Sequence, residues 1–332
     1  MCDIYLMTQG TRAGIENNRM VVSKNGEQLN SVPFQTIDTI SVYGNVQLTT
    51  QLIGACLSRS VPVSLFTGTG ICKGEILSPG SVNVSLQRLQ TQVYYQPELC
   101  LAFAKTIIRA KIHNQRVLIR RYASVNTVSA EAGIRVLRNI EQKMENADTE
   151  EKLMGYEGIS ARVYFQTLGQ LVNPQFAFKG RSKRPPTDPF NALISLGYTL
   201  LHNEIGAKIS AKGLNPYFGI MHKDRNGHKA LASDLIEEWR PVIADALAMS
   251  ILNGRELLAD DFVRSEGGVY LTPAALKKYT LKFRERMDRE YVYLLDDTSR
   301  ADVHTLIQKQ IEGVVRVLRK GDAQCYQPVR IR

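Results

Sequence analysis

The chain has 332 residues, which is more than one compact core usually holds, so we expect two domains. Hydrophobic residues make up 44% and charged residues 22%, as in globular proteins, and no stretch reaches the roughly 18 uninterrupted apolar residues of a membrane helix. The first residues lack the basic region of a secretory signal, and the five cysteines are scattered, so we expect a cytoplasmic protein without a disulfide framework or zinc ribbon.

The charge balance favours a polyanionic partner. The net charge is +10 and the isoelectric point is about 9.3. Basic side chains that neutralise phosphates release counterions, so a surplus this large is typical of nucleic-acid binding. A basic protein without such a partner is the alternative.

Residues 1–80 have a β-like pattern. The stretch "RMVVSKNGEQL" combines β-branched residues with Asn25-Gly26, which predicts a type I′ hairpin. "IDTISVYG" and "SVPVSLF" predict two short strands, and "LTTQLIGACLSRS" predicts a helix between them. We therefore expect a β-rich N-terminal domain over residues 1–80.

The remainder of the chain is predicted to be helical. Residues 78–97 contain turn residues without a firm period, so we expect a linker or hinge at 81–97. From Leu99 onward the pattern is almost wholly helical. The predicted fold class is α+β, with the β-rich domain joined by a hinge to a larger all-α catalytic domain over residues 98–332.

The first predicted helix of the second domain has a basic face. Steps of four and seven residues place four side chains together: Lys105, Arg109, Arg116 and Arg120. Because this helix offers no carboxylate to pair with them, the stripe favours a DNA-facing surface. A solvated basic face is the alternative.

A second basic cluster precedes a long helix. It consists of Lys179, Arg181, Lys183 and Arg184. Asp188 is placed to cap the following helix, with Pro189 at its first position and Gly213 just past its end.

Residues 219–241 are the strongest candidate for a chemical site. A helix is predicted from about Lys229 to Arg240, with Pro241 ending it. At 100° per residue its apolar side chains share one side, and Asp234, Glu237 and Glu238 share the other. The three acids are therefore either a solvated face or part of a metal site.

Two histidines lie close upstream of these acids, His222 and His228. Carboxylates with one imidazole suit Mn²⁺ or Mg²⁺ better than zinc. The spacing does not choose between the two histidines, and a third ligand must come from elsewhere. Glu157, predicted at the first turn of a helix, is the candidate; a carboxylate that stabilises the helix dipole is its alternative interpretation.

Four motif blocks resemble one family. "GYEGISARVYF", "FKGRSKRPPTDPFNALISLGY" and "GLNPYFGIMH…LASDLIEEWRP" are similar, in order, to the motifs of the CRISPR-associated integrase family Cas1, and "AKIHNQRVLIRR" resembles the family's segment after its linker. The family's E-G-x-x-A-x-x-Y-F, R-R-P-P-x-D-P, G-x-x-P-x-x-G-x-x-H and D-x-x-E-x-x-R-P patterns are all present, except that Lys183 replaces one arginine.

The resemblance implies a catalytic set of Glu157, His222, Asp234 and Glu237. The metal ligands would be Glu157, His222 and Glu237, with Asp234 as a further acid beside the metal. Glu238 falls outside the set and is expected to be exposed or paired, and His228 has no counterpart. His113, His202 and His304 match no motif and are interpreted as structural.

The resemblance further implies a metal-dependent DNA endonuclease and integrase that inserts foreign DNA fragments into a CRISPR array. Bound Mn²⁺ or Mg²⁺ would activate a 3′-hydroxyl for transesterification on the repeat DNA, without a nucleotide cofactor. The two basic clusters would bind the DNA backbone.

The implied partners are double-stranded DNA, a second copy of the chain paired through the β-rich domains, and the small Cas2 protein. Three alternatives remain: a non-catalytic DNA-binding protein, a metal-dependent nuclease on branched DNA or RNA, and a structural hub of the acquisition complex.

Overall fold

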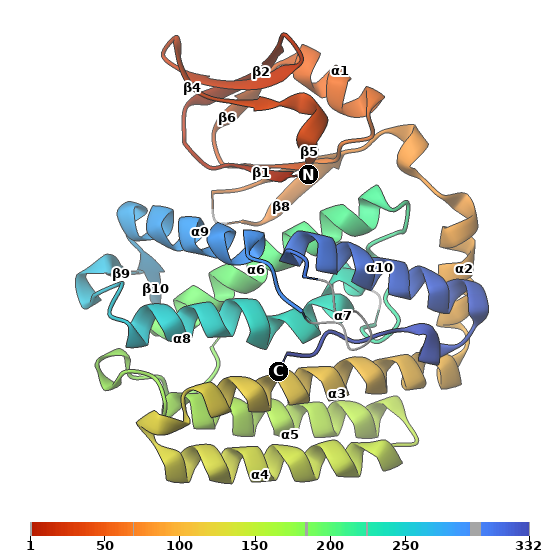
Figure 1. The fold of residues 1–332 in the computed structure, drawn as a ribbon, viewed down its shortest axis with the longest axis vertical. Helices are drawn as coiled ribbons and strands as arrows, with labels where there is room; N and C mark the ends of the chain where they lie inside the picture. The colour runs from red at the N-terminus through yellow and green to blue at the C-terminus, as the bar shows by residue number, and fades with distance from the viewer. Residues whose placement is uncertain (1, 69, 183–184, 224, 293–299, 332) are drawn as a thin grey trace.

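The computed structural model describes residues 2–68, 70–182, 185–223, 225–292 and 300–331. Figure 1 shows strands gathered at the N-terminal end of the molecule and helices filling the rest. The predicted α+β class, with an N-terminal β-rich part and a larger helical part, is confirmed.

The N-terminal part contains two four-stranded sheets. The first has the order β1-β5-β7-β8 and the second the order β4-β3-β2-β6. Their bounds are β1 Cys2–Leu6, β2 Thr11–Glu16, β3 Arg19–Lys24, β4 Glu27–Pro33, β5 Ile37–Tyr43, β6 Val46–Leu48, β7 Val63–Phe66 and β8 Cys72–Ile76. Helix α1, Thr50–Ser58, shares a buried apolar cluster with both sheets.

The predicted hairpin is confirmed. Strands β3 and β4 pair antiparallel, and both turn residues have positive φ, 51° at Asn25 and 86° at Gly26. Asparagine and glycine tolerate these angles, which a type I′ turn requires.

The segment that we expect to be a linker contains a helix. Residues 84–94 form helix α2, Val84–Tyr94, whose side chains Leu86, Gln90 and Val93 are buried. Asn83 caps its start by accepting from the Leu86 N–H. The segment is therefore a packed helix that runs from the sheets towards α3 (Figure 1). Its buried face is too short to give a clear helical spacing of apolar residues in the sequence.

The helical part is built around a large common core. Its helices are α3 Pro97–Arg121, α4 Thr127–Lys143, α5 Glu150–Gly169, α6 Pro189–Ala211, α7 Ala230–Trp239, α8 Ala246–Asn253, α9 Pro273–Asp288 and α10 Val303–Lys320. Helices α3, α4 and α5 stack in one layer, and α7 contacts both α3 and α6 (Figure 1). The all-α expectation needs one correction, because β9 Phe262–Ser265 and β10 Gly268–Leu271 form a small hairpin.

The boundaries of α6 follow its sequence signals. The Asp188 side chain accepts from the Asn191 N–H at 2.8 Å, and Pro189 is the first helical residue. Gly213 follows the last turn with φ +81°, the left-handed conformation that favours glycine.

Pro241 does not end a helix. The chain continues from α7 through a π-helical segment, Arg240–Asp245, directly into α8. The wider π turn accommodates a residue without an N–H, so proline here changes the helix type instead of stopping the helix.

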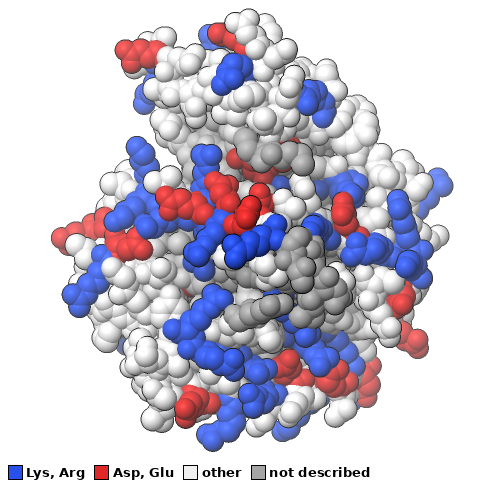
Figure 2. Space-filling model, in the orientation of Figure 1, with Lys and Arg blue, Asp and Glu red and all other residues white. Residues whose placement is uncertain are grey.

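Charge is unevenly distributed between the two parts. The first 80 residues contain five Lys/Arg and five Asp/Glu, so the surplus of +10 belongs entirely to the helical part. On the face seen in Figure 2, basic side chains are sparse over the sheets and dense over the helices. Across the described ranges, every helix is too short or too polar to cross a membrane.

Candidate metal centre

The acids of α7 are buried. Asp234 and Glu238 are 0% exposed and Glu237 is 3% exposed. The solvated-face interpretation is wrong, because α7 packs against both α3 and α6 and every one of its residues is buried. Buried carboxylates require hydrogen bonds or cations, and the three acids satisfy this requirement in three different ways.

Asp234 organises the loop that carries His222. Its carboxylate accepts from the backbone N–H groups of Ile220, Met221 and His222 at 2.7, 3.1 and 2.8 Å. It also contacts Nδ1 of His222 at 2.7 Å. Burial lowers the pKa of His222, but the hydrogen bond and charge of Asp234 outweigh burial and raise it. This contact fixes the ring and leaves Nε2 as the nitrogen that can bind a metal.

Glu157 and Glu237 converge on one cation. The Lys111 ammonium contacts Oε1 of Glu157 and lies 2.6 Å from Oε2 of Glu237. Arg240 contacts the other oxygen of Glu237 at 2.5 Å. Burial would raise the pKa of Glu237, but the charges of Arg240 and Lys111 hold it at about 2. His222 is also close enough to Glu237 for their charges to interact.

Glu157 lies deeper in its helix than predicted. Helix α5 begins at Glu150, capped by Thr149, so Glu157 is in the third turn. The helix-dipole interpretation is therefore wrong for Glu157, since the dipole acts on the first turn. Its position instead lets a carboxylate from α5 meet one from α7 across Lys111 of α3.

These residues suit a hard divalent cation. Two carboxylates and an imidazole that is held by a third carboxylate form an oxygen-rich donor set. Two cationic side chains already sit on these carboxylates, which shows that the site attracts positive charge. Glu157, His222 and Glu237 are neighbours, although their ligand atoms do not all lie within 4.8 Å of one another.

Glu238 does not belong to this site. Its carboxylate accepts from the Tyr326 hydroxyl at 3.0 Å, the Val329 N–H at 2.8 Å and the Gln310 amide at 3.2 Å. Burial raises its pKa to about 8, and these donors offset only part of that effect. Glu238 thus anchors the C-terminal segment to α7 and α10.

A cleft of about 1890 Å³ opens beside Glu157. Its lining also includes Lys111 and residues 70–74 of the N-terminal part. Asp245 lines the same cleft and accepts from the hydroxyls of Tyr164 and Tyr198 at 2.7 and 2.5 Å. Burial raises the pKa of Asp245 to about 6, partly offset by these two bonds.

The predicted basic loop lies in part on this cleft. Lys179 is exposed, and both Lys179 and Arg181 line the cleft. Arg181 donates to the Asn191 side chain at 2.8 Å and lies over the Tyr198 ring, so it is also tied to α6. Lys183 and Arg184 lie outside the described residues.

The basic face of α3 has carboxylate partners after all. Arg109 contacts Glu145 at 2.9 Å, and Arg116 contacts Glu141. The lack of carboxylates within the predicted helix does not leave these arginines unpaired, because Glu141 comes from α4 and Glu145 from the turn that follows it. Arg120 is exposed, and DNA contact by Arg109, Arg116 and Arg120 stays a prediction.

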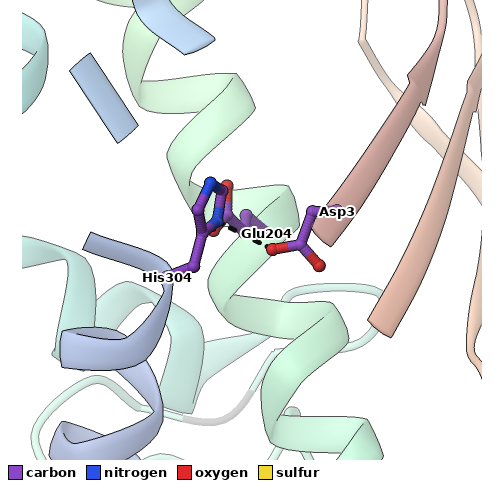
Figure 3. Close-up of side chains that lie close together, drawn as sticks. All are labelled: Asp3, Glu204 and His304. Atoms are coloured by element: carbon purple, nitrogen blue, oxygen red, sulfur yellow. Dashed lines mark hydrogen bonds and ion pairs between the residues drawn. The ribbon is translucent and has the colours of Figure 1, made fainter. Parts of the chain in front are cut away.

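A second cluster joins the two parts of the molecule (Figure 3). Asp3 of β1, Glu204 of α6 and His304 of α10 have ligand atoms within 4.8 Å of one another, the one such group of three in the described ranges. By distance alone these residues could hold a cation. However, Lys208 lies 2.8 Å from Asp3, and the two carboxylates outweigh burial to raise the pKa of His304 to about 11.

The two buried carboxylates of this second cluster therefore already face an ammonium and an imidazolium, and the half-exposed carboxylate of Asp288 also contacts Nε2 of His304 at 3.2 Å. The other histidines have local roles: His113 contacts the Ile331 carbonyl at 2.9 Å, and His228 contacts Ser233 and stacks near His202.

Comparison with known proteins identifies the family. A family model described as CRISPR associated protein Cas1 matches residues 4–285. A CRISPR-associated endonuclease Cas1 from Mycobacterium tuberculosis is 33% identical over 323 residues, covering 97% of this chain and 95% of the relative. The chain is a member of the Cas1 family. A Cas1 endonuclease from Rhodospirillum rubrum is 34% identical over 342 residues, covering 98% and 97% of the two chains.

Solved structures confirm the Cas1 fold. A CAS1 protein from Thermotoga maritima has a TM-score of 0.81 at 21% identity, covering 96% of this chain and 97% of its own. A casposase bound to integration product has a TM-score of 0.80 at 21% identity, covering 97% and 92%. A Cas6-RT-Cas1–Cas2 complex has a TM-score of 0.84 at 24% identity over 100% of this chain and 36% of that one.

The sequence motifs missed the cations of the site. Lys111 stands inside the quoted "AKIHNQRVLIRR" and Arg240 inside "EEWRP", but neither was assigned a role. These cations could have been expected, because two buried carboxylates need basic side chains close by to compensate their charge. The Asp3, Glu204 and His304 cluster carried no signal, since its members are far apart in sequence and match no motif.

Proposed function

We propose that this Cas1 protein is a metal-dependent DNA endonuclease and integrase that inserts DNA fragments into a CRISPR array. One observation carries the proposal: carboxylates from α5 and α7 meet at a single cation position, beside an imidazole fixed by a buried aspartate. Membership of a family whose curated relatives are named endonucleases supports the same activity.

The proposed ligands are Glu157, Glu237 and Nε2 of His222, with Mn²⁺ or Mg²⁺ as the cation. When bound, the cation supplies Lewis-acid stabilisation of charge on a phosphodiester. Asp234 holds the imidazole through Nδ1 and does not bind the metal itself, because its two oxygens already accept four hydrogen bonds. Asp234 is thus a positioning residue.

The cleft is the proposed DNA-binding site. Lys179, Arg181 and Glu157 line this same cleft. Cationic side chains position a strand through its phosphates. A 3′-hydroxyl attacking a repeat phosphodiester would form one phosphoester bond and release another 3′-hydroxyl, so no nucleotide cofactor is needed.

We also propose the assembly and location that the family implies. The protein would act in the cytoplasm as a homodimer paired through the sheets, with exposed strand edges available for pairing. Cas2 is the proposed second partner, since one structural neighbour is a Cas1–Cas2 complex.

An integration assay tests the proposal. Purified protein with Cas2, a short labelled duplex and a repeat-containing plasmid should give joined product with Mn²⁺ and none with a chelator. Glu157→Gln and His222→Ala should each lower joining by about 100-fold or more. Glu312→Gln, an exposed carboxylate paired with Lys212, is the control and should behave as the unaltered protein.

Two outcomes would contradict the proposal. Joining that survives both substitutions would place the chemistry elsewhere. Metal-dependent cleavage of branched DNA or RNA without any joining would favour a nuclease that does not integrate.

A further inference from the structure

Lys111 lies in the candidate metal site, but none of the sequence motifs gives it a role. It lies on α3, it is 4% exposed, and it contacts one carboxylate from α5 and another from α7. Of these two carboxylates Arg240 contacts Glu237, and its guanidinium lies over the Tyr198 ring. Within the described residues, Lys111 is therefore the one cation that contacts both Glu157 and Glu237.

We propose that Lys111 is a placeholder cation: its ammonium neutralises Glu157 and Glu237 in the metal-free protein and must leave them when the metal binds. This inference rests on the proposed function, because it takes Glu157 and Glu237 as metal ligands. It adds that the metal competes with the Lys111 ammonium for the two carboxylates. The ammonium therefore keeps the metal-free protein stable. It also makes metal binding weaker than it would be if no cation contacted these carboxylates.

The electrostatics support competition. Two carboxylates this deeply buried would repel each other without a cation between them. An ammonium and a divalent ion cannot both approach the same carboxylate oxygens closely, since their charges are alike. The ion pairs of Lys111 therefore oppose metal binding directly.

The structure also offers the displaced ammonium another position. Gln115 lies one helical turn after Lys111 on α3, on the same face. Its Oε1 is buried and has no hydrogen-bond partner within the described structure. Both residues line the cleft, so a small change of side-chain rotamer moves the charge without unfolding α3.

The test is direct measurement of Mn²⁺ binding, from the electron paramagnetic resonance signal of free Mn²⁺, together with melting in chelator and in Mn²⁺. Lys111→Met should bind Mn²⁺ about tenfold more tightly or better, because the competing charge is gone. In chelator it should melt about 5 °C or more below the unaltered protein, and Mn²⁺ should restore most of that difference.

Lys229→Met is the matched control. Lys229 is also a buried lysine, 5% exposed, and it contacts a single carboxylate, Glu75, at 2.6 Å. Its loss should lower the melting temperature without tightening Mn²⁺ binding. If Lys111→Met folds neither in chelator nor in Mn²⁺, the same measurements use Lys111→Gln. The glutamine amide is neutral but can still donate hydrogen bonds to both carboxylates.

The outcomes separate the two claims. Unchanged or weaker Mn²⁺ binding by Lys111→Met overturns the placeholder role. Adding Glu157→Gln to Lys111→Met should weaken Mn²⁺ binding by tenfold or more. If it does not, the proposed ligand set itself is wrong, whatever the lysine does.

Discussion

Glu237 and Glu238 are adjacent and both buried, yet their surroundings shift their pKa values in opposite directions. Cations from α3 and from the π-helical segment contact Glu237 and keep its pKa at about 2. Among the described residues, Glu238 accepts its hydrogen bonds from neutral donors, and burial raises its pKa to about 8. The difference separates a carboxylate suited to metal binding from one suited to anchoring the chain.

Glu238 should make the protein less stable as pH rises. Its ordinary pKa of 4.5 is raised to about 8 on folding, so its stabilisation is complete below pH 4.5 and is lost as pH rises through 8. In Glu238→Gln the melting temperature should fall less between pH 5 and pH 9 than in the unaltered protein. Parallel pH profiles for the two proteins would contradict the assigned burial effect.

Asp234 should matter for metal binding although it is not a ligand. Asp234→Asn keeps the shape but weakens the hold on Nδ1 of His222, and losses of about 10- to 100-fold in metal affinity are typical for such partners. Mn²⁺ titration measures the effect. Equal affinity in Asp234→Asn would show that the ring is positioned by other contacts.

At the level of single elements, the sequence predicted the boundaries that local capping signals set. Asp188, Pro189 and Gly213 define α6 as expected, because capping is a local interaction. The continuation of the helix past Pro241 into α8 was not predicted, since a π-helical segment depends on packing around Pro241 that the local sequence does not encode. The burial of α7 was missed for the same reason: the lysine that compensates its acids lies on α3.

Gly213 also fixes α6 against the start of α2. A Cβ at this position would lie 2.8 Å from the Ser81 carbonyl oxygen and 2.7 Å from the Asn83 Cβ. Gly321, which ends α10 with φ +64°, has open space instead. Gly321→Ala should cost about 1 kcal/mol in the free energy of unfolding, from the backbone conformation alone. Gly213→Ala should cost about 1–3 kcal/mol more, from the steric clash.

Urea denaturation compares the two variants. Equal losses of stability would show that the chain before α2 moves aside freely, and that the close approach at Gly213 does not matter.

At the scale of the whole molecule, buried charges join the sheets to the helices. Asp3 of β1 contacts Lys208 of α6 and His304 of α10, and the Tyr5 hydroxyl contacts Glu204. The sequence predicted both parts of the fold, and the acids and the imidazole that it proposes for a metal centre lie close together in the structure. It could not reveal this junction, because its charges meet only after the chain has folded.

A double-mutant cycle on Asp3→Asn and Lys208→Met measures the strength of the junction. Each single change removes one partner of a buried ion pair and should cost about 3 kcal/mol or more, whereas the double variant should lose about 1–3 kcal/mol less than the sum. The exposed pair Lys212 and Glu312 should couple by about 0.5 kcal/mol or less. Additive losses at Asp3 and Lys208 would show that their contact does not hold the two parts together.

Two places among the described residues gather groups that could hold a cation, and we propose that only the one at α5 and α7 serves chemistry. An anomalous difference map from crystals soaked in Mn²⁺ tests this claim most directly. We expect an anomalous peak between Glu157, His222 and Glu237, with the Lys111 ammonium moved away from both carboxylates. A peak at Asp3, Glu204 and His304 instead, with Lys111 still bridging Glu157 and Glu237, would contradict it.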